Sequence, residues 1–297
     1  MSDRAEGTLG AWRTAIDAEL AGIATDQGDL PSRLREAIHY SLTGEGKRLR
    51  GLLLMASFDA LHGRGDASAL AAAIEVVHAY SLVHDDLPCM DDDSMRRGRP
   101  TTHRAFDVAT ATVAGVTMVP LAVDQTVRGA RRLELEAPTT NALVGTLMRA
   151  SGAIGMLGGQ LMDLEGEGQA LSVAELEAVH RAKTGALIAA ALCMGGIAAK
   201  ANKRALDALA AAGSALGLAF QIADDVLDAT ESSEMLGKTA GHDAALSKST
   251  YASVLGVVPA RQRSDALVAD AMAKLDAAAL RTQPLERLAH FVAARRS

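Results

Sequence analysis

Apolar residues recur every three or four positions along most of this 297-residue chain, the spacing that lines one face of an α-helix. No run of alternating polar and apolar residues is long enough to indicate a β-sheet. The pattern predicts an amphipathic helix near Ile16, another that opens at Pro31, and further helices at 49–61, 68–87, 104–133, 139–163, 172–199, 202–230 and 264–294. We therefore expect an all-α fold.

The chain carries no sign of division into separate units. No proline-rich linker or shift in composition interrupts it, so we expect residues 1–297 to form a single domain. Only 3% of the residues are aromatic, so Ala, Leu, Val, Ile and Met must build most of the core. The polar, glycine-punctuated segment 231–250 predicts a loop beside a site.

Charge and cysteine content exclude several classes of protein. A net charge of −6 without a long basic run argues against nucleic acid as a partner. Cys89 and Cys193 lie too far apart in sequence to indicate a disulfide framework, which fits a reducing cytoplasm. The N-terminus lacks the apolar core of a signal peptide, and the uncharged runs 186–199 and 108–123 are shorter than a bilayer span. We expect a cytoplasmic protein without a membrane span.

Two acidic clusters stand where carboxylates are unfavourable. In HDDLPCMDDDSMRRGR (84–99), Asp85 and Asp86 fall in the last turn of a predicted helix, next to the negative end of its dipole. In the second cluster, Asp224 and Asp228 are four residues apart in an otherwise apolar helix, so they share a face and repel each other. A divalent cation would relieve this repulsion.

Hard oxygen ligands without clustered cysteine or histidine favour Mg²⁺ over zinc. Because Mg²⁺ often completes its shell with substrate phosphates, basic residues are expected nearby. Candidates are Lys47, Arg48, Arg50, Arg96, Arg97, Lys183, Lys238 and Lys248. For the acidic run 91–93, a solvated surface is an equally good interpretation.

The motifs together resemble those of the trans-isoprenyl diphosphate synthases, and among them the bacterial farnesyl diphosphate synthases. The resemblance covers about residues 44–256, in the family's order and spacing. It rests on GKRLR (46–50), EVVHAYSLVHDDLPCMDDDSMRRGRPTTH (75–103), GMLGGQLMDL (155–164), KTGAL (183–187), FQIADDVLD (220–228) and GKTAGHDAALSKSTY (237–251).

This resemblance implies a large helical bundle around a deep central cavity, active as a homodimer. It also implies head-to-tail condensation of isopentenyl diphosphate with an allylic diphosphate. About three Mg²⁺ ions would be held by Asp85, Asp91 and Asp224, with Asp225 and Asp228 acting mostly through water.

The resemblance also assigns the remaining site residues. Lys47, Arg50, His78 and Arg97 would bind isopentenyl diphosphate. Arg96, Lys183, Lys238 and Lys248 would hold the allylic diphosphate. Thr184 and Gln221 would face the reacting carbons. From spacing alone, His78 is better explained as an ordinary core histidine, and only the family match favours diphosphate binding.

Product length is assigned to Tyr80 and the adjacent Ser81. Tyr80 lies five residues before Asp85, about 7.5 Å of helix rise away, and a bulky aromatic residue there resembles the farnesyl-forming type. A plain core tyrosine would pack equally well, and geranyl or geranylgeranyl products are the alternatives within the family. The sequence departs from the family's usual pattern at Gly51, where proline is usual, at GVTM (115–118), where GDAL is usual, and at His242, where lysine is frequent.

Two interpretations of other classes stay open. His84 and Asp85 form the HD pair of a metal phosphohydrolase, although this leaves the second acidic motif and KTGAL unexplained. A non-catalytic subunit of a heteromeric synthase is the other possibility, and the intact aspartates of both motifs argue against it.

Overall fold

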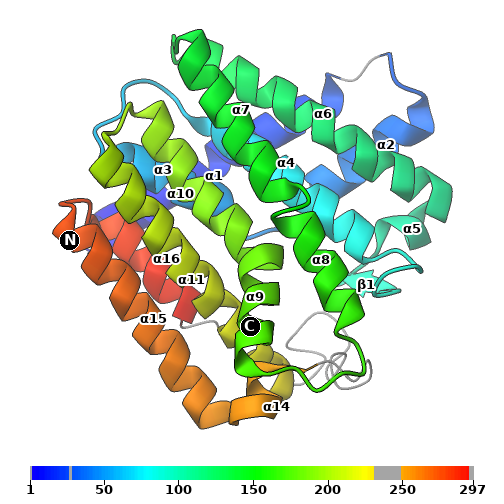
Figure 1. Cartoon of the computed structure of the whole chain (residues 1–297). Helices are drawn as coiled ribbons and strands as arrows, with labels where there is room; N and C mark the ends of the chain where they lie inside the picture. The colour runs from blue at the N-terminus through cyan, green and yellow to red at the C-terminus, as the bar shows by residue number, and fades with distance from the viewer. Residues whose placement is uncertain (1, 27–28, 231–248, 294–297) are drawn as a thin grey trace.

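The computed structural model describes residues 2–26, 29–230 and 249–293, and Figure 1 shows them as an assembly of long helices. The all-α prediction is confirmed. The helices are α1 (Ser2–Thr25), α2 (Ser32–Leu42), α3 (Leu49–Ala60), α4 (Ser68–Asp85), α5 (Thr102–Ala105), α6 (Val108–Arg132), α7 (Ala137–Ser151), α8 (Met156–Glu165), α9 (Val173–His180), the π-helical η1 (Arg181–Gly185), α10 (Ala186–Ala198), α11 (Lys203–Thr230), α14 (Tyr251–Leu255), α15 (Val257–Ala277) and α16 (Gln283–Ala293).

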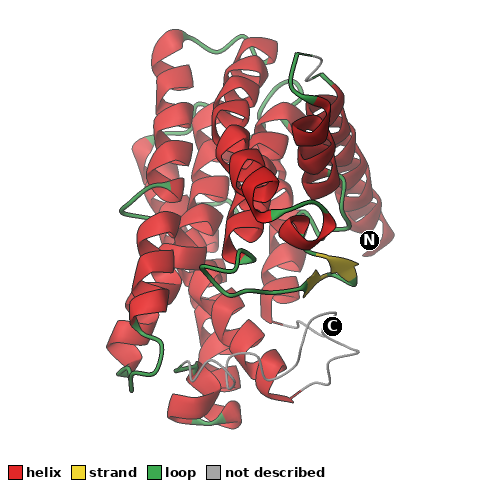
Figure 2. Cartoon of the chain, turned by 90° about the vertical axis from the view of Figure 1, so that its right-hand side faces the viewer, coloured by secondary structure: helices red, strands yellow, loops and turns green. Residues whose placement is uncertain are grey.

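One short hairpin interrupts the helices, and Figure 2 shows it beside the ends of several of them. Strand β1 (Met95–Arg96) pairs antiparallel with β2 (Arg99–Pro100). Arg97 and Gly98 form the turn with φ of 52° and 72°, the left-handed angles that a two-residue hairpin turn of type I′ requires. Two-residue strands are too short to leave an alternating pattern, so the sequence did not predict them.

Two of the predicted helices are broken in the structure. The range 139–163 is divided into α7 and α8 because Gly152 and Gly155 take non-helical backbone angles. The range 264–294 is divided into α15 and α16 by Ala279, which is left-handed at φ 57°. There the Leu280 N–H donates to the Leu275 carbonyl at 2.8 Å, the bond that closes a helix in a Schellman motif.

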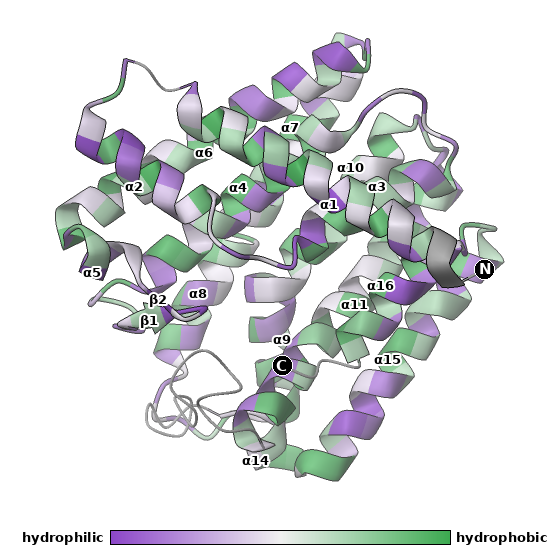
Figure 3. Ribbon diagram, turned by 180° about the vertical axis from the view of Figure 1, so that it is seen from behind, coloured by the Kyte–Doolittle hydropathy of each residue, from purple (hydrophilic) through white to green (hydrophobic). Residues whose placement is uncertain are grey.

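Helix α4 lies against α3 and α6, while α10 lies against α3 and α11. Seen from behind in Figure 3, α1 and α16, which contact each other and α3, lie on the near side of these helices. The main core cluster extends from Ile16 in α1 to Val292 in α16. Small residues permit close approach: a Cβ at Gly217 would lie 2.5 Å from the Gly185 Cα, so η1 sits directly on α11.

Two helices, α6 and α11, are long and apolar enough to cross a membrane by length and composition alone. Of their most apolar stretches, 33% and 56% are buried within the protein. Core helices of globular proteins pass the same test, and α11 packs against α10 and α15. The sequence predicted a helix at 202–230, close to the bounds of α11, but did not single it out as one of the apolar runs.

Candidate active site

A cavity of about 1230 Å³ lies among α3, α4, α8, η1 and α11. Every described part of the predicted site contributes to its wall except Tyr80. The predicted residues that line it are Lys47, Arg50, His78, Ser81, Asp85, Asp91, Arg96, Arg97, Lys183, Thr184, Gln221 and Asp224. Segments that are far apart in the sequence therefore meet in one place.

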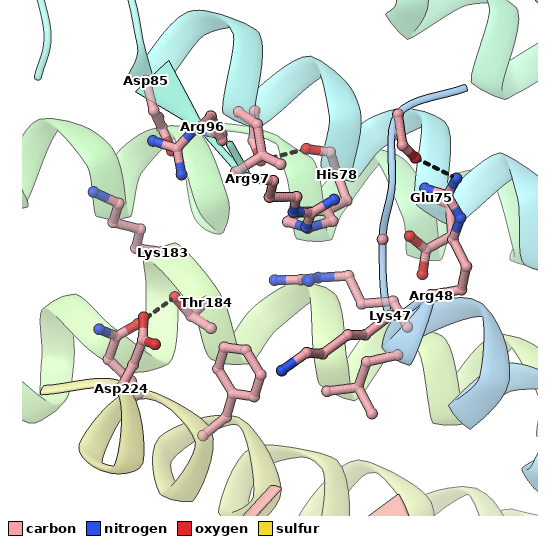
Figure 4. Close-up of a pocket in the computed structure, with 18 of the residues that line it drawn as sticks. Lys47, Arg48, Glu75, His78, Asp85, Arg96, Arg97, Lys183, Thr184 and Asp224 are labelled. Carbon is pink, nitrogen blue, oxygen red and sulfur yellow. Dashed lines mark hydrogen bonds between the residues drawn. The ribbon is translucent and has the colours of Figure 1, made fainter. Parts of the chain in front are cut away.

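The two acidic motifs occupy facing walls of this cavity. In Figure 4, Asp85 of α4 lies on one side, Asp224 of α11 lies on the other, and the Lys183 side chain of η1 points into the space between them. Burial raises the pKa of Asp85; the Lys183 charge opposes this effect, and Asp91 adds to it. The Asp85 carboxylate is thus poorly stabilised as an anion, which suits binding of a cation.

Arg96 is held by carboxylates of its own motif. It donates to Asp86 at 2.6 Å and to Asp93 at 3.1 Å. Burial of Asp86, which is 3% exposed, raises its pKa to about 7, although Arg96 acts in the opposite direction. Burial acts to lower the pKa of Arg96, but Asp86 outweighs it and the pKa rises. Asp86 and Asp93 therefore orient Arg96, while the exposed Asp92 pairs with Arg104 at 3.4 Å.

The opposite end of the cavity is basic. Arg48 and Arg97 both have left-handed backbones, with φ of 50° and 52°. Arg48 donates to Asp17 at 2.7 Å and to the Gly44 carbonyl at 2.8 Å, and Arg97 donates to the Glu45 carbonyl at 2.8 Å. These bonds tie the loop before α3 to the hairpin turn.

His78 lies among these cations on α4. Its Nδ1 is buried without a hydrogen-bond partner among the described residues. Burial lowers its pKa well below 6.5, and Arg50 and then Arg97 lower it further, so the ring is neutral at pH 7. Lys47, which lies 5.3 Å from the centre of the Phe291 ring, completes this end (Figure 4).

The unusual Gly51 has a local explanation. Its backbone N–H donates to the buried Glu75 carboxylate at 2.8 Å. A proline has no N–H to offer, so the substitution gives Glu75 a donor that the usual residue lacks. Gly51 thus supports the wall of the cavity without entering it.

The residues predicted to face the reacting carbons are linked to one another. Thr184 donates to the Gln221 amide oxygen at 3.0 Å, shown as a dashed line in Figure 4. Lys183 donates to Asp163 at 2.7 Å. Both η1 residues belong to a π-helical turn, a feature frequent at functional sites because it redirects side chains.

Tyr80 is buried and lies outside the set of cavity-lining residues. Its ring packs edge-on against His84, with centroids 4.8 Å apart. The His84 Nε2 is 3.2 Å from the Thr112 carbonyl oxygen, and a Cβ at Gly115 would lie 2.3 Å from this nitrogen. The glycine of GVTM therefore makes room for His84, whereas Ser81 and Leu82 form the cavity wall.

Several lining residues received no role from the sequence. Gln160 has both amide atoms buried with no hydrogen-bond partner among the described residues. Asp163, His180 and Phe291 also line the cavity. Gln160 and Asp163 belong to GMLGGQLMDL, which was part of the resemblance, but neither was singled out, and nothing marked His180 or Phe291. Of the predicted residues, Lys238 and Lys248 lie outside the described part of the chain, as does His242.

Within residues 2–26, 29–230 and 249–293, no three His, Cys, Asp or Glu side chains are close enough together to hold a metal ion by themselves. The donors that line the two acidic walls are carboxylates, the preferred ligands of Mg²⁺. The raised pKa of Asp85 shows that its charge lacks compensation. Carboxylates from each wall fit Mg²⁺ that also takes oxygen ligands from a bound diphosphate.

The family model "Polyprenyl synthetase" matches residues 31–281. The farnesyl diphosphate synthase of Bacillus subtilis (strain 168) is 36% identical, and the match covers 99% of each chain.

The chain is also similar to solved structures. An apo structure of an FPP/GFPP synthase from Zymomonas mobilis superposes with a TM-score of 0.86 at 34% identity, covering 99% of this chain and 100% of that one. A geranyltransferase from Helicobacter pylori, complexed with magnesium and isoprenyl diphosphate, gives 0.82 at 29% identity, covering 96% and 95%. In both sequence and fold, the chain is similar to these proteins.

Proposed function

The chain belongs to the polyprenyl synthetase family, and from this premise we propose that it condenses isopentenyl diphosphate head-to-tail with allylic diphosphates to give farnesyl diphosphate. It is a prenyltransferase. The observation that carries the proposal is one cavity with two facing acidic walls, a lysine between them and a separate basic end.

The two ends of the cavity suit two different diphosphates. Lys47, Arg50, His78 and Arg97 gather at the basic end and would bind isopentenyl diphosphate. Because the His78 ring is neutral at pH 7, it binds as a hydrogen-bond donor rather than as a cation. Its buried nitrogen then finds a partner in the ligand.

The allylic diphosphate would lie between the acidic walls. Asp85, Asp91 and Asp224 would hold Mg²⁺ there, about three ions by resemblance, and the metal would supply positive charge to the diphosphate oxygens. Lys183 and Arg96 carry further positive charge at the same place. Preorganised charge of this kind stabilises the diphosphate as its bond to carbon breaks, so no side-chain nucleophile is required.

Thr184 and Gln221 lie beside this position and would face the allylic cation. Their oxygens stabilise positive charge without forming a covalent bond. The isopentenyl double bond then attacks the cation, and a proton is lost to the departing diphosphate. The protein's own side chains would bind and orient the two substrates and exclude water from the reacting carbons.

We assign product length to the wall formed by Ser81, with Tyr80 packed behind it. Ser81 contacts the cavity directly, whereas Tyr80 would limit growth by closing the space between α4 and α6. A fifteen-carbon product fits this arrangement. Longer products remain the alternative, since the Zymomonas mobilis relative is described as an FPP/GFPP synthase.

A phosphohydrolase of the HD type has less support. The His84 ring contacts the Thr112 carbonyl on α6, while Asp85 lines the cavity. The two residues of the HD pair therefore do not converge on one site.

We further propose that residues 1–297 form a single domain and that the protein is cytoplasmic. Two copies of the chain would form a homodimer. Exposed apolar side chains concentrate on α6 and around the start of α8, where a second copy would cover them. They are Val108, Val113, Val116, Ile154, Leu157 and Leu161.

Incubation with dimethylallyl diphosphate, isopentenyl diphosphate and Mg²⁺, followed by analysis of product chain length, tests the function. Farnesyl diphosphate is expected. Release of phosphate from either substrate alone would favour hydrolysis instead.

A further inference from the structure

Asp225, the middle carboxylate of the second acidic motif, is bound by protein donors on both oxygens. The Gln221 amide nitrogen donates to Oδ1 at 3.0 Å, and the Tyr251 backbone N–H donates to Oδ2 at 2.9 Å. Asp225 is 3% exposed, whereas the adjacent Asp224 is half-buried. These contacts give Asp225 a different environment from that of its neighbour.

The contact with Asp225 decides which way the Gln221 amide points. An ionised carboxylate only accepts hydrogen bonds, so the NH₂ group of Gln221 must face Asp225. The amide oxygen is then left to accept from the Thr184 hydroxyl at 3.0 Å. Because Thr184 uses its hydrogen in this bond, oxygen atoms rather than hydrogens are available to a positive charge in the cavity.

His180 lies beside Asp225 on the other side. Its Nε2 is 3.4 Å from the Asp225 Oδ2, a close approach without hydrogen-bond geometry, and both side chains are buried. The His180 ring stacks on the ring of Tyr251, with centroids 5.7 Å apart and planes 25° apart. Tyr251 is fully buried at the start of α14, so the imidazole has little freedom to move.

We propose that His180 and Asp225 are positioning residues that fix the Gln221 amide with its oxygen toward the allylic carbocation. The inference rests on the proposed prenyl transfer, because only that reaction forms a carbocation that the Gln221 dipole would stabilise. Oriented in advance, this dipole stabilises the cation without reorganisation during the reaction. Asp225 then acts through Gln221 and not as a ligand of Mg²⁺.

Asp225→Asn tests the orientation directly, because it keeps the shape and exchanges one acceptor for a donor. If the oxygen of the introduced amide keeps the bond from the Tyr251 N–H, its NH₂ group meets the NH₂ group of Gln221, and the Gln221 amide must turn over. We expect kcat to fall about tenfold or more. We expect the half-saturating Mg²⁺ concentration and the KM for geranyl diphosphate to stay within about twofold. Asp224→Asn is the matched control and should raise the Mg²⁺ requirement.

His180 is tested by a pair of variants. His180→Phe keeps the stack on Tyr251 and removes the nitrogen near Asp225, so kcat should fall about as far as in Asp225→Asn. His180→Gln keeps a nitrogen donor and should retain most of kcat. In a Gln221→Ala background, both Asp225→Asn and His180→Phe should have little further effect, because the group through which they act is gone.

A raised Mg²⁺ requirement in Asp225→Asn would overturn the inference by making Asp225 a metal ligand. Equal losses of kcat in His180→Phe and His180→Gln would show that His180 contributes only packing. If Asp225→Asn and His180→Phe lowered kcat as much in the Gln221→Ala background as in wild type, these residues would not act through Gln221. If His180→Phe does not fold, as judged by circular dichroism, the isosteric Asp225→Asn still decides. Wild-type turnover is measured first, since its absence would reject the proposed function itself.

Discussion

The Lys183 ammonium group donates a 2.7 Å hydrogen bond to the Asp163 carboxylate, across the space between η1 and α8. The bond keeps Lys183 extended between the two acidic walls, where it also lowers the pKa of Asp85 against the effect of burial. The lysine is therefore already oriented where negative charge would accumulate on the leaving diphosphate.

Lys183→Ala should lower kcat/KM for geranyl diphosphate by about 10²-fold or more, because a preorganised charge at the leaving group is lost. Steady-state kinetics measures the change. Lys203→Ala, which removes an exposed lysine paired with Asp207, is the matched control and should keep activity near wild type. Equal activity in both variants would remove Lys183 from the site.

Asp85→Ala or Asp224→Ala should nearly abolish turnover without lowering the thermal unfolding midpoint. Each variant removes a proposed metal ligand, and Asp85→Ala also removes a carboxylate that burial leaves poorly stabilised. Asp92→Ala is the control within the first motif, since the exposed Asp92 pairs with His103 and Arg104 of α5. Most activity surviving in Asp85→Ala would contradict the metal assignment.

Tyr80→Ala should shift the product toward twenty carbons, because loss of the ring opens space behind Ser81 and next to His84. Chromatography of the dephosphorylated products measures chain length. Ser81→Phe, which places bulk in the cavity wall itself, should shift the product toward ten carbons. An unchanged distribution in Tyr80→Ala would leave Tyr80 as an ordinary core residue.

The depressed pKa of His78 predicts a loss of stability in acid. In the folded state burial and nearby arginines keep the ring neutral, whereas the unfolded chain takes up a proton as the pH falls below about 6.5. Stability is therefore full above this pH and declines below it, by up to about 1.4 kcal/mol at pH 5.5. Urea unfolding of wild type and His78→Gln at pH 5.5 and 7.5 checks this, because only wild type should show this contribution.

Val116→Arg on α6 should convert the proposed dimer into monomers, because a charge at a covered apolar surface is unfavourable. Sedimentation velocity gives the mass. Val258→Arg on α15, where the valine is 66% exposed, is the matched control and should leave the assembly unchanged. A dimer that survives Val116→Arg would place the interface elsewhere.

The sequence predicted the features that depend on the local spacing of residues, namely helix positions and the residues that share a helix face. Helical periodicity defined most helices, and on α4 it placed His78, Ser81 and Asp85 on one face, which is the face that lines the cavity. The same periodicity turns Tyr80 to another side of the helix, where it packs against His84, the residue that contacts α6. Helix breaks at single residues such as Ala279 left no composition signal.

Contacts between distant segments were beyond prediction from spacing. His180 and Asp225 are separated by most of α10 and α11, and only packing of η1 on α11 brings them within 3.4 Å. Lys183 and Asp163 meet for a similar reason, through the approach of α8 to η1. The residues of the site were readable from motifs, but the hydrogen bonds that orient them required the fold.

The most direct test of the central claim is the reaction of geranyl diphosphate with isopentenyl diphosphate and Mg²⁺, with both product and released diphosphate measured. Farnesyl diphosphate is predicted, with one diphosphate released for each isopentenyl diphosphate consumed. Diphosphate or phosphate released equally well without isopentenyl diphosphate, and no fifteen-carbon product, would contradict it.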